Sequence, residues 1–281
     1  MPRFSLPDWL KKHQYTYKTL DEVPEELFAS LRAKLERFTC EVPEVSVLMP
    51  VWNEEENLLR TLSTFAEQAT TRKVELVLLN NNSTDRTQEI IDRCGVRSVF
   101  VPTQGISFAR QAGLEAAKGT YHLCSDGDSF YPPGWIDAMV AELQKPTTSV
   151  AHGRHSFIPT ENDGRIVLGL YELLAESLFD IRRKNREYLN VLGFNFAFRT
   201  ADGKKVGGFN TSRPRWSDGW MAMSLMELGK IVCINSDDAR VWTSARRLIA
   251  DGSLGKAFKR RIKKEIVRLK EYFVNPPIKL D

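Results

Sequence analysis

VSVLMPVWNEEE, residues 45–56, is the stretch that decides the fold class. Its first six residues form an apolar run stopped by Pro50, which is typical of a strand buried on both faces of a sheet. Asn53 lies three residues before Glu56, a spacing that predicts a capping box and a helix running through Glu67. The stretch therefore predicts a buried strand followed directly by a helix.

The same alternation continues downstream. Further strands are expected over 74–80, 97–101 and 120–125, with helices beginning near 83–85, over 108–117 and after Pro133. Strands that alternate with helices predict an α/β domain with a mostly parallel sheet flanked by helices. Beyond Val150 the pattern loosens. There we expect helices over 167–185 and 218–228, a turn at Gly207–Gly208, and strands over 193–199, 231–235 and 239–243.

The two ends of the chain differ from this central part, which we assign to 44–250. Residues 1–43 are predicted to be an N-terminal extension with a helix over 24–38, whose apolar side is Leu27, Leu31, Leu35 and Phe38. Residues 251–281 are predicted to form a basic amphipathic helix and tail. Packing on the central domain is the favoured interpretation of this helix. Shallow binding to an anionic membrane is the alternative.

Composition narrows the functional class. The chain has 281 residues and a net charge of only +4, which together with the absence of an arginine-rich segment argues against nucleic acid as a partner. No window approaches the run of about 18 apolar residues that a spanning helix needs, and no secretory leader is recognisable. The four cysteines are scattered, as expected in a reducing compartment. We expect a cytoplasmic protein, with the inner face of the membrane as an alternative place of work.

Polar residues follow the predicted strands, where an open α/β sheet forms its ligand crevice. They are Asn53–Glu54, Asn80–Asn82 and Asp126–Asp128. In an extended segment the carboxylates of Asp126 and Asp128 face the same way and can hold one Mg²⁺ or Mn²⁺, and Gly127 lets a ligand approach closely. The alternative is a solvated turn, because Asp-Gly-Asp also suits turns.

Together these segments resemble the family 2 glycosyltransferases, which adopt the GT-A fold. The family's first strand ends in Pro-x-Tyr-Asn-Glu, its second in Asp-Asp-x-Ser-x-Asp, and a Gly-x-x-x-Ala-Arg segment precedes an Asp-x-Asp. The corresponding residues here are Pro50–Glu54, Asn80–Asp85, Gly105–Arg110 and Asp126–Asp128, and the resemblance extends over about residues 44–245.

The resemblance implies roles for these residues in binding a nucleoside-diphosphate sugar. Pro50, Trp52 and Glu54 would border the base and ribose, and Asn80 would contact the base. Asparagine stands at Asn80 where the family often has aspartate, which leaves the base open. Arg110 would lie near the nucleotide, Asp126 near the ribose or metal, and Asp128 on the metal. The alternatives are compensation of a helix dipole for Glu54 and turn formation for the asparagine run.

A second acidic site is implied downstream. Gly207-Gly208-Phe209 followed by Ser217-Asp218 resembles the family's Gly-Gly-Phe segment and acidic pair, with Ser217 where glutamate often stands. Asp218 would be the general base that takes the acceptor's proton; the alternative is a helix N-cap. Arg246, with Arg247 beside it, would close over the diphosphate, since arginine matches phosphate geometry. An ordinary surface pair is the alternative.

These observations favour an inverting glycosyltransferase that uses Mn²⁺ or Mg²⁺ and a glycan, polysaccharide or lipid-linked acceptor. The alternatives are a non-catalytic sugar-nucleotide-binding module and a nucleotidyltransferase. The first strand is not followed by the glycine-rich phosphate loop expected of the latter. His152 and His155 are set aside as a zinc site, because in one strand they would point to opposite faces.

Overall fold

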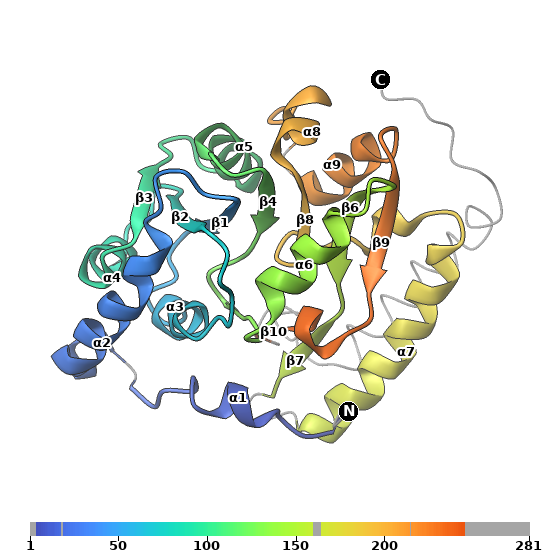
Figure 1. The fold of residues 1–281 in the computed structure, drawn as a ribbon. Coiled ribbons are helices and arrows are strands. Elements are labelled where there is room, and N and C mark those ends of the chain that lie inside the picture. Colours follow the sequence, from blue (N-terminus) through green and yellow to red (C-terminus); the bar gives the residue numbers. More distant parts are fainter. Residues whose placement is uncertain (1–3, 18, 160–163, 214, 245–281) are drawn as a thin grey trace.

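A seven-stranded sheet forms the centre of the molecule (Figure 1). The computed structural model describes residues 4–17, 19–159, 164–213 and 215–244. The strand order in the sheet is β3-β2-β1-β4-β8-β6-β9. In chain order these strands are β1 (Val45–Val51), β2 (Val74–Asn80), β3 (Arg97–Phe100), β4 (Tyr121–Cys124), β6 (Thr148–Gly153), β8 (Phe196–Arg199) and β9 (Lys230–Ile234).

The sheet is mostly parallel, as predicted. β1 lies between β2 and β4 and is parallel to both, and β3 extends the parallel part beyond β2. β8 is antiparallel to its neighbours β4 and β6, while β9 is parallel to β6. Every residue of β1 and β2 is buried, in agreement with the continuous apolar runs in their sequences. The carboxyl ends of β1, β2, β4 and β6 therefore meet at one edge of the sheet.

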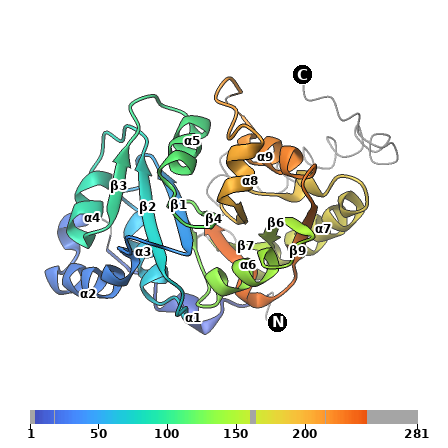
Figure 2. The same cartoon turned by 45° about the horizontal axis from the view of Figure 1, so that its top comes forward.

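Helices cover both faces of this sheet (Figure 2). One face packs against α3 (Leu58–Ala66), α4 (Thr87–Cys94) and α6 (Trp135–Leu143). The other packs against α5 (Ile106–Ala116) and α9 (Ser217–Leu225), with α8 (Thr200–Lys205) beside them. β1 contributes to both sides, since Val47 and Met49 belong to the first core and Leu48 to the opposite one.

The N-terminal extension is part of the first core. It contains α1 (Asp8–Lys11), α2 (Glu25–Leu35) and short 3₁₀ turns at Leu20–Glu22 and Glu36–Phe38. Leu31, Leu35 and Phe38 are buried among residues of α3 and α4, and Leu27 packs against them partly buried. The predicted apolar side of this helix is confirmed.

A second, three-stranded sheet has the order β5-β10-β7 and was not anticipated. It consists of β5 (Ser129–Phe130), β7 (His155–Ile158) and β10 (Val241–Ser244). β10 is antiparallel to β5 and parallel to β7. From β7 the chain leads toward α7 (Arg165–Arg183), which lies at the opposite end of the molecule from α2 and α4 (Figure 1).

Several local predictions are wrong in detail. Asn53 and Glu56 form no capping box: α3 begins at Leu58, its N-cap Asn57 makes no side-chain cap, and Asn53 has a left-handed φ of 52°. Helix α4 begins at Thr87 rather than near 83–85, and α6 begins at Trp135, two residues after Pro133. β8 occupies only the second half of the predicted strand over 193–199. The strands β5, β6 and β7 and the helix α8 were missed, and the C-terminal segment 251–281 lies outside the described residues.

Candidate active site

The loops after β1 and β2 are fastened to each other by side chain to backbone hydrogen bonds. The Asn53 N–H donates to Ser83 Oγ (3.1 Å), and the Thr84 N–H donates to Asn53 Oδ1 (2.8 Å). The Glu55 N–H donates to Asp85 Oδ2 (3.0 Å). The two loops that follow β1 and β2 are therefore joined into one structure.

Pro50, Trp52 and Glu54 differ in how far they are exposed. Pro50 lies within β1, and Trp52, one residue beyond the strand, is 54% exposed. Glu54 is buried, and its Oε2 accepts a hydrogen bond from Asn57 Nδ2 (2.9 Å). It is not compensating a helix dipole in a first turn, because α3 has no acidic residue there. The exposed indole of Trp52 could stack on a base, and the buried carboxylate of Glu54 could accept a hydrogen bond from the same nucleotide.

Asn80 and Asn81 hold the second loop in place. Asn80 ends β2, is 3% exposed, accepts from the Ser83 N–H (3.0 Å) and donates to Gln88 Oε1 (2.7 Å). The side chain of Asn81 donates to the carbonyls of Val101 and Thr103, and accepts from the Gly105 N–H. The turn-forming interpretation of the asparagine run is supported, and the Asn80 amide is already engaged within the protein.

Asp126, Gly127 and Asp128 form a turn between β4 and β5. The extended geometry assumed for the pair of carboxylates is therefore wrong, since the turn occupies Gly127 and Asp128. A Cβ on Gly127 would lie 2.9 Å from Val51 Cγ1, so glycine is required here by close packing on the end of β1. Asp128 is 6% exposed and its Oδ1 lies 3.4 Å from the Ser129 hydroxyl.

A buried tyrosine fixes the beginning of this turn. Tyr131 Oη accepts from the Asp126 N–H (2.8 Å) and donates to the carbonyl of Phe194 (3.0 Å). Burial, and then the nearby Asp126 charge, raise the pKa of the Tyr131 phenol well above its usual value, so the hydroxyl keeps the proton that it donates. Tyr131 thus couples Asp126 to the loop 191–195.

Arg110 connects Asp126 to the beginning of α9. It is 7% exposed, its Nη1 donates to Ser217 Oγ (2.8 Å), and its Nη2 lies 3.8 Å from Asp126 Oδ1. A Cβ on Gly193 would lie only 1.5 Å from Arg110 Nη2, so the guanidinium packs directly against the backbone of this glycine. Ser217, which stands where the resembling family often has glutamate, is here the hydrogen-bond partner of Arg110.

Asp218 is held by two backbone N–H groups. Its Oδ2 accepts from Gly193 (2.7 Å) and its Oδ1 from Gly219 (2.9 Å). The interpretation as an N-cap is wrong, because α9 begins at Ser217 and Trp216 is its N-cap residue. Burial raises the pKa of the nearby Cys124 thiol, and the charges of Arg110, Asp126 and Asp218 all act on that thiol. The structure thus brings these three predicted residues together.

Aromatic side chains lie beside Asp218. Trp216 is 38% exposed and has a left-handed φ of 63°, which is strained for a bulky residue. Its ring packs over Gly219 and meets Trp220 edge-on at a centroid distance of 5.3 Å and Tyr188 at 6.0 Å. Strain of this kind is concentrated at functional sites.

Cation binding by Asp126 and Asp128 stays a prediction that rests on the chemistry of these residues. Carboxylate oxygens suit Mg²⁺ or Mn²⁺, which commonly take one or two carboxylates and complete their shell with phosphate oxygens and water. Asp126 and Asp128 supply two such groups, and within the described residues they are not joined by a third acidic, histidine or cysteine ligand. Arg246 lies outside the described residues. Thr243, three positions earlier, pairs with Ser129, the residue after Asp128.

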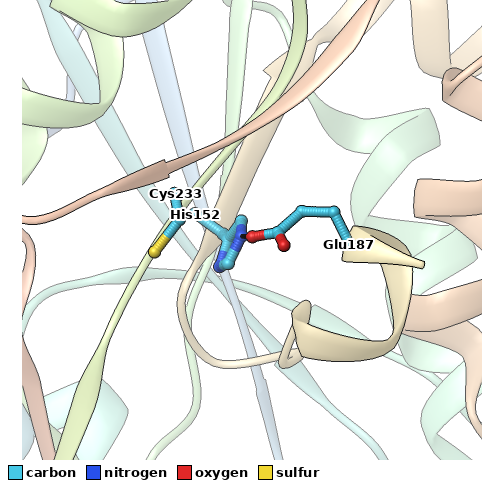
Figure 3. Close-up of side chains that lie close together, drawn as sticks. All are labelled: His152, Glu187 and Cys233. Carbon is cyan, nitrogen blue, oxygen red and sulfur yellow. Dashed lines mark hydrogen bonds and ion pairs between the residues drawn. The ribbon is translucent and has the colours of Figure 1, made fainter. Parts of the chain in front are cut away.

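The histidines set aside from the sequence belong to two different strands, so the argument that they share one strand is wrong. His152 lies on β6 beside Cys233 of β9, and its Nε2 is 2.8 Å from Glu187 Oε1. Figure 3 shows the His152 ring between Cys233 and Glu187. Glu187 begins the 3₁₀ turn Glu187–Asn190, which leads directly to Gly193. This pair therefore supports the loop that binds Asp218.

Sequence analysis did not single out Gly193, Tyr131 or the loop 191–195. Gly193 lay within a predicted strand, and Tyr131 is separated from the acidic triplet by the strand β5, which was not predicted. A glycine before an aromatic strand is too common a pattern to identify such a contact.

Comparison with known proteins gives a consistent result. The family model described as glycosyl transferase family 2 matches residues 46–205. An uncharacterized glycosyltransferase of Haemophilus influenzae is 30% identical over 128 residues, covering 43% of this chain and 51% of the relative. A validoxylamine A glucosyltransferase of Streptomyces hygroscopicus subsp. limoneus is 27% identical over 210 residues, covering 63% and 46%. The chain spans about half the length of these curated relatives.

Solved structures identify the architecture as GT-A. A mannosyltransferase of Pyrobaculum calidifontis, solved in complex with GDP-Man and Mn²⁺, superimposes with a TM-score of 0.54 at 20% identity. The match covers 85% of this chain and 76% of that one.

Proposed function

The chain belongs to glycosyl transferase family 2, and we propose that it moves one sugar from a nucleoside-diphosphate sugar to an acceptor hydroxyl, with inversion at the anomeric carbon. The proposal rests above all on one observation. Asp218 is held by the Gly193 N–H on a loop that also carries the hydrogen-bond partner of Tyr131, and Tyr131 in turn holds Asp126. A candidate base is thereby fixed relative to the backbone of Asp126, a candidate donor-binding residue.

The donor half of the site consists of the loops after β1, β2 and β4. Trp52 offers an exposed aromatic surface for a base, Glu54 a buried carboxylate, and Asn80 a polar group at the end of β2. Asp126 and Asp128 would hold Mn²⁺ or Mg²⁺ together with the donor's diphosphate. When bound, such a cation neutralises the charge that develops on the departing diphosphate. Arg246 is proposed to add a second positive charge there.

The acceptor half begins at Asp218. In the transfer step the acceptor oxygen forms a bond to the anomeric carbon while the bond from that carbon to the diphosphate oxygen breaks. The hydroxyl proton passes to the Asp218 carboxylate, which the two N–H groups keep in a fixed orientation. Trp216, which is 38% exposed, provides an aromatic surface against which a carbohydrate ring can pack. A glycan, polysaccharide or lipid-linked sugar is therefore the proposed acceptor class.

The test is a donor screen with the purified full chain. The protein is incubated with Mn²⁺ and a panel of nucleotide sugars, and thermal stabilisation and release of nucleoside diphosphate are measured. We expect one donor to stabilise the fold in a Mn²⁺-dependent manner and to be turned over with an acceptor. The anomeric configuration of the product, determined by NMR, checks inversion. Stabilisation without turnover over a broad acceptor panel would favour the sugar-nucleotide-binding module, and no stabilisation by any donor would contradict the proposal.

A further inference from the structure

The apolar residues of helix α7 face outward and its charged residues face inward, which is the reverse of an ordinary surface helix. Its outward face carries large apolar side chains that are between 39% and 63% exposed, namely Ile166, Val167, Leu170, Leu173, Leu174 and Ile181. We call these six residues the α7 face. In a helix surrounded by water, such residues normally face the core. A contiguous apolar surface of this kind marks an interaction site.

The inward side of α7 carries the charges instead. Glu172 is 4% exposed and forms a two-pronged ion pair with Arg165, at 2.6 and 2.7 Å. Glu176, also buried, pairs with Arg154 (2.8 Å) and Arg240 (3.2 Å). The ion pairs of Glu176 with Arg154 and Arg240 join α7 to other segments, so α7 cannot turn its apolar side inward without leaving these charges uncompensated.

The charge around the α7 face is suited to an anionic surface. Within α7, every residue of which is described, Asp180 is the one exposed acidic residue, and it already pairs with Arg154 and Arg183. At the carboxyl end of the helix follow Lys184, which is exposed, and Arg186. An apolar face flanked by cations is the pattern of helices that lie in the plane of a membrane surface.

The sequence that continues beyond β10 is basic as well. β10 ends at Ser244, which pairs with Ile158 at the end of β7, the strand that leads toward α7. The sequence after β10 contains the apolar and basic residues 254–273, which lie outside the described part of the chain.

We propose that the α7 face binds the surface of an anionic lipid bilayer, with α7 lying in the plane of the interface. None of the described helices combines the length and apolarity that crossing a bilayer requires. The contact is therefore a surface contact. It would bring the bilayer to the side of the molecule where the turn Glu187–Asn190 and α9 lie, since that turn contacts both α7 and α9. This inference does not depend on the proposed sugar transfer.

The test is flotation of the full-length protein with vesicles of phosphatidylcholine alone or mixed equally with phosphatidylglycerol. We expect the protein to float with the anionic vesicles only. The double variant Leu170→Glu with Leu174→Glu should lower the bound fraction at least about tenfold, because each side chain would carry a charge into the interface. A matched control is Val42→Glu with Phe100→Glu, which places the same charges at apolar residues that are 78% and 61% exposed elsewhere. It should float like the original protein.

Two further measurements separate the other possible occupants of the α7 face. Light scattering without vesicles reports the oligomeric state, and a polarity-sensitive dye attached to Leu170→Cys, in a Cys40→Ser, Cys233→Ser background, reports whether the face is covered. We expect a monomer whose dye becomes buried only when anionic vesicles are added. A dimer lost in the double variant would assign the face to a second copy. A dye that is buried without lipid would assign it to the chain's own C-terminal segment. Each of these two results would overturn the proposal. Equal flotation of all variants, or no flotation at all, would also overturn it.

Discussion

Replacing Asp218 by asparagine tests the proposed base with the smallest change of shape. In the structure Asp218 Oδ2 accepts from the Gly193 N–H at 2.7 Å, and Oδ1 accepts from the Gly219 N–H at 2.9 Å. The asparagine oxygen can keep one of these hydrogen bonds. Its NH₂ group cannot accept the other, because both groups are donors.

The expected magnitudes for stability and catalysis differ. Loss of one partly exposed hydrogen bond costs about 1 kcal/mol of unfolding free energy, so the variant should fold. Asp218 is not an N-cap, so no capping loss is added. A positioned general base contributes about 10²–10⁴-fold to the rate, equivalent to about 3–5 kcal/mol of barrier. The rate of transfer should therefore fall by about two to four orders of magnitude.

The assay separates these effects. Urea unfolding measures stability, thermal shift with nucleotide sugar and Mn²⁺ measures donor binding, and diphosphate release in the presence of acceptor measures transfer. We expect nearly unchanged donor binding together with the loss of transfer. Asp237→Asn, at an exposed aspartate outside the site, is the control and should retain full transfer. If Asp218→Asn kept full transfer, or lost transfer only in proportion to donor binding, Asp218 would not be the base.

Three further perturbations follow from the same geometry. Asp128→Ala should abolish the Mn²⁺ dependence of donor stabilisation, and a variant that still responds to Mn²⁺ would remove Asp128 from the cation site. Gly193→Ala would place a methyl group 1.5 Å from Arg110 Nη2, so transfer should fall at least about tenfold with little loss of fold, whereas Gly164→Ala, with no atom within 4 Å, should be neutral in both assays. Burial lowers the pKa of His122 from 6.5 to about 3. Below pH 6.5 the unfolded chain therefore binds a proton at His122 that the native state does not bind. The free energy of unfolding consequently decreases as the pH falls below about 6.5. His122→Phe should make unfolding less sensitive to pH by up to about 1.4 kcal/mol per pH unit between pH 6.5 and 5, and an unchanged pH profile from urea midpoints would contradict this.

The sequence determined the parallel half of the fold. Apolar runs such as 45–51 and 74–80 bury both faces of a strand, and that pattern is local and strong. The order in which polar residues follow these strands also pointed to Asp126, whereas Arg110 and Asp218 were predicted from the resemblance to family 2 glycosyltransferases. Asp126 lies at the edge of the sheet where β1 and β2 also end, because parallel strands place their carboxyl ends together.

Boundaries were predicted less well, and the reason is visible at Asn53. Its spacing to Glu56 matches a capping box, but a partner 31 residues away satisfies its side chain instead. Local propensity cannot anticipate a competitor from another loop. The same holds for β5, whose two residues form a strand only because β10 pairs with them from the far end of the described chain.

The arrangement of the candidate site residues was decided by tertiary structure alone. The N–H that orients Asp218 comes from Gly193, and the hydroxyl that orients Asp126 comes from Tyr131, which the same loop binds through Phe194. Backbone groups have no signature in the sequence, because every residue other than proline carries the same N–H. The sequence therefore determined which side chains could act, whereas only the packing of the loop 191–195 against β4 and α9 decided how two of them are held in place.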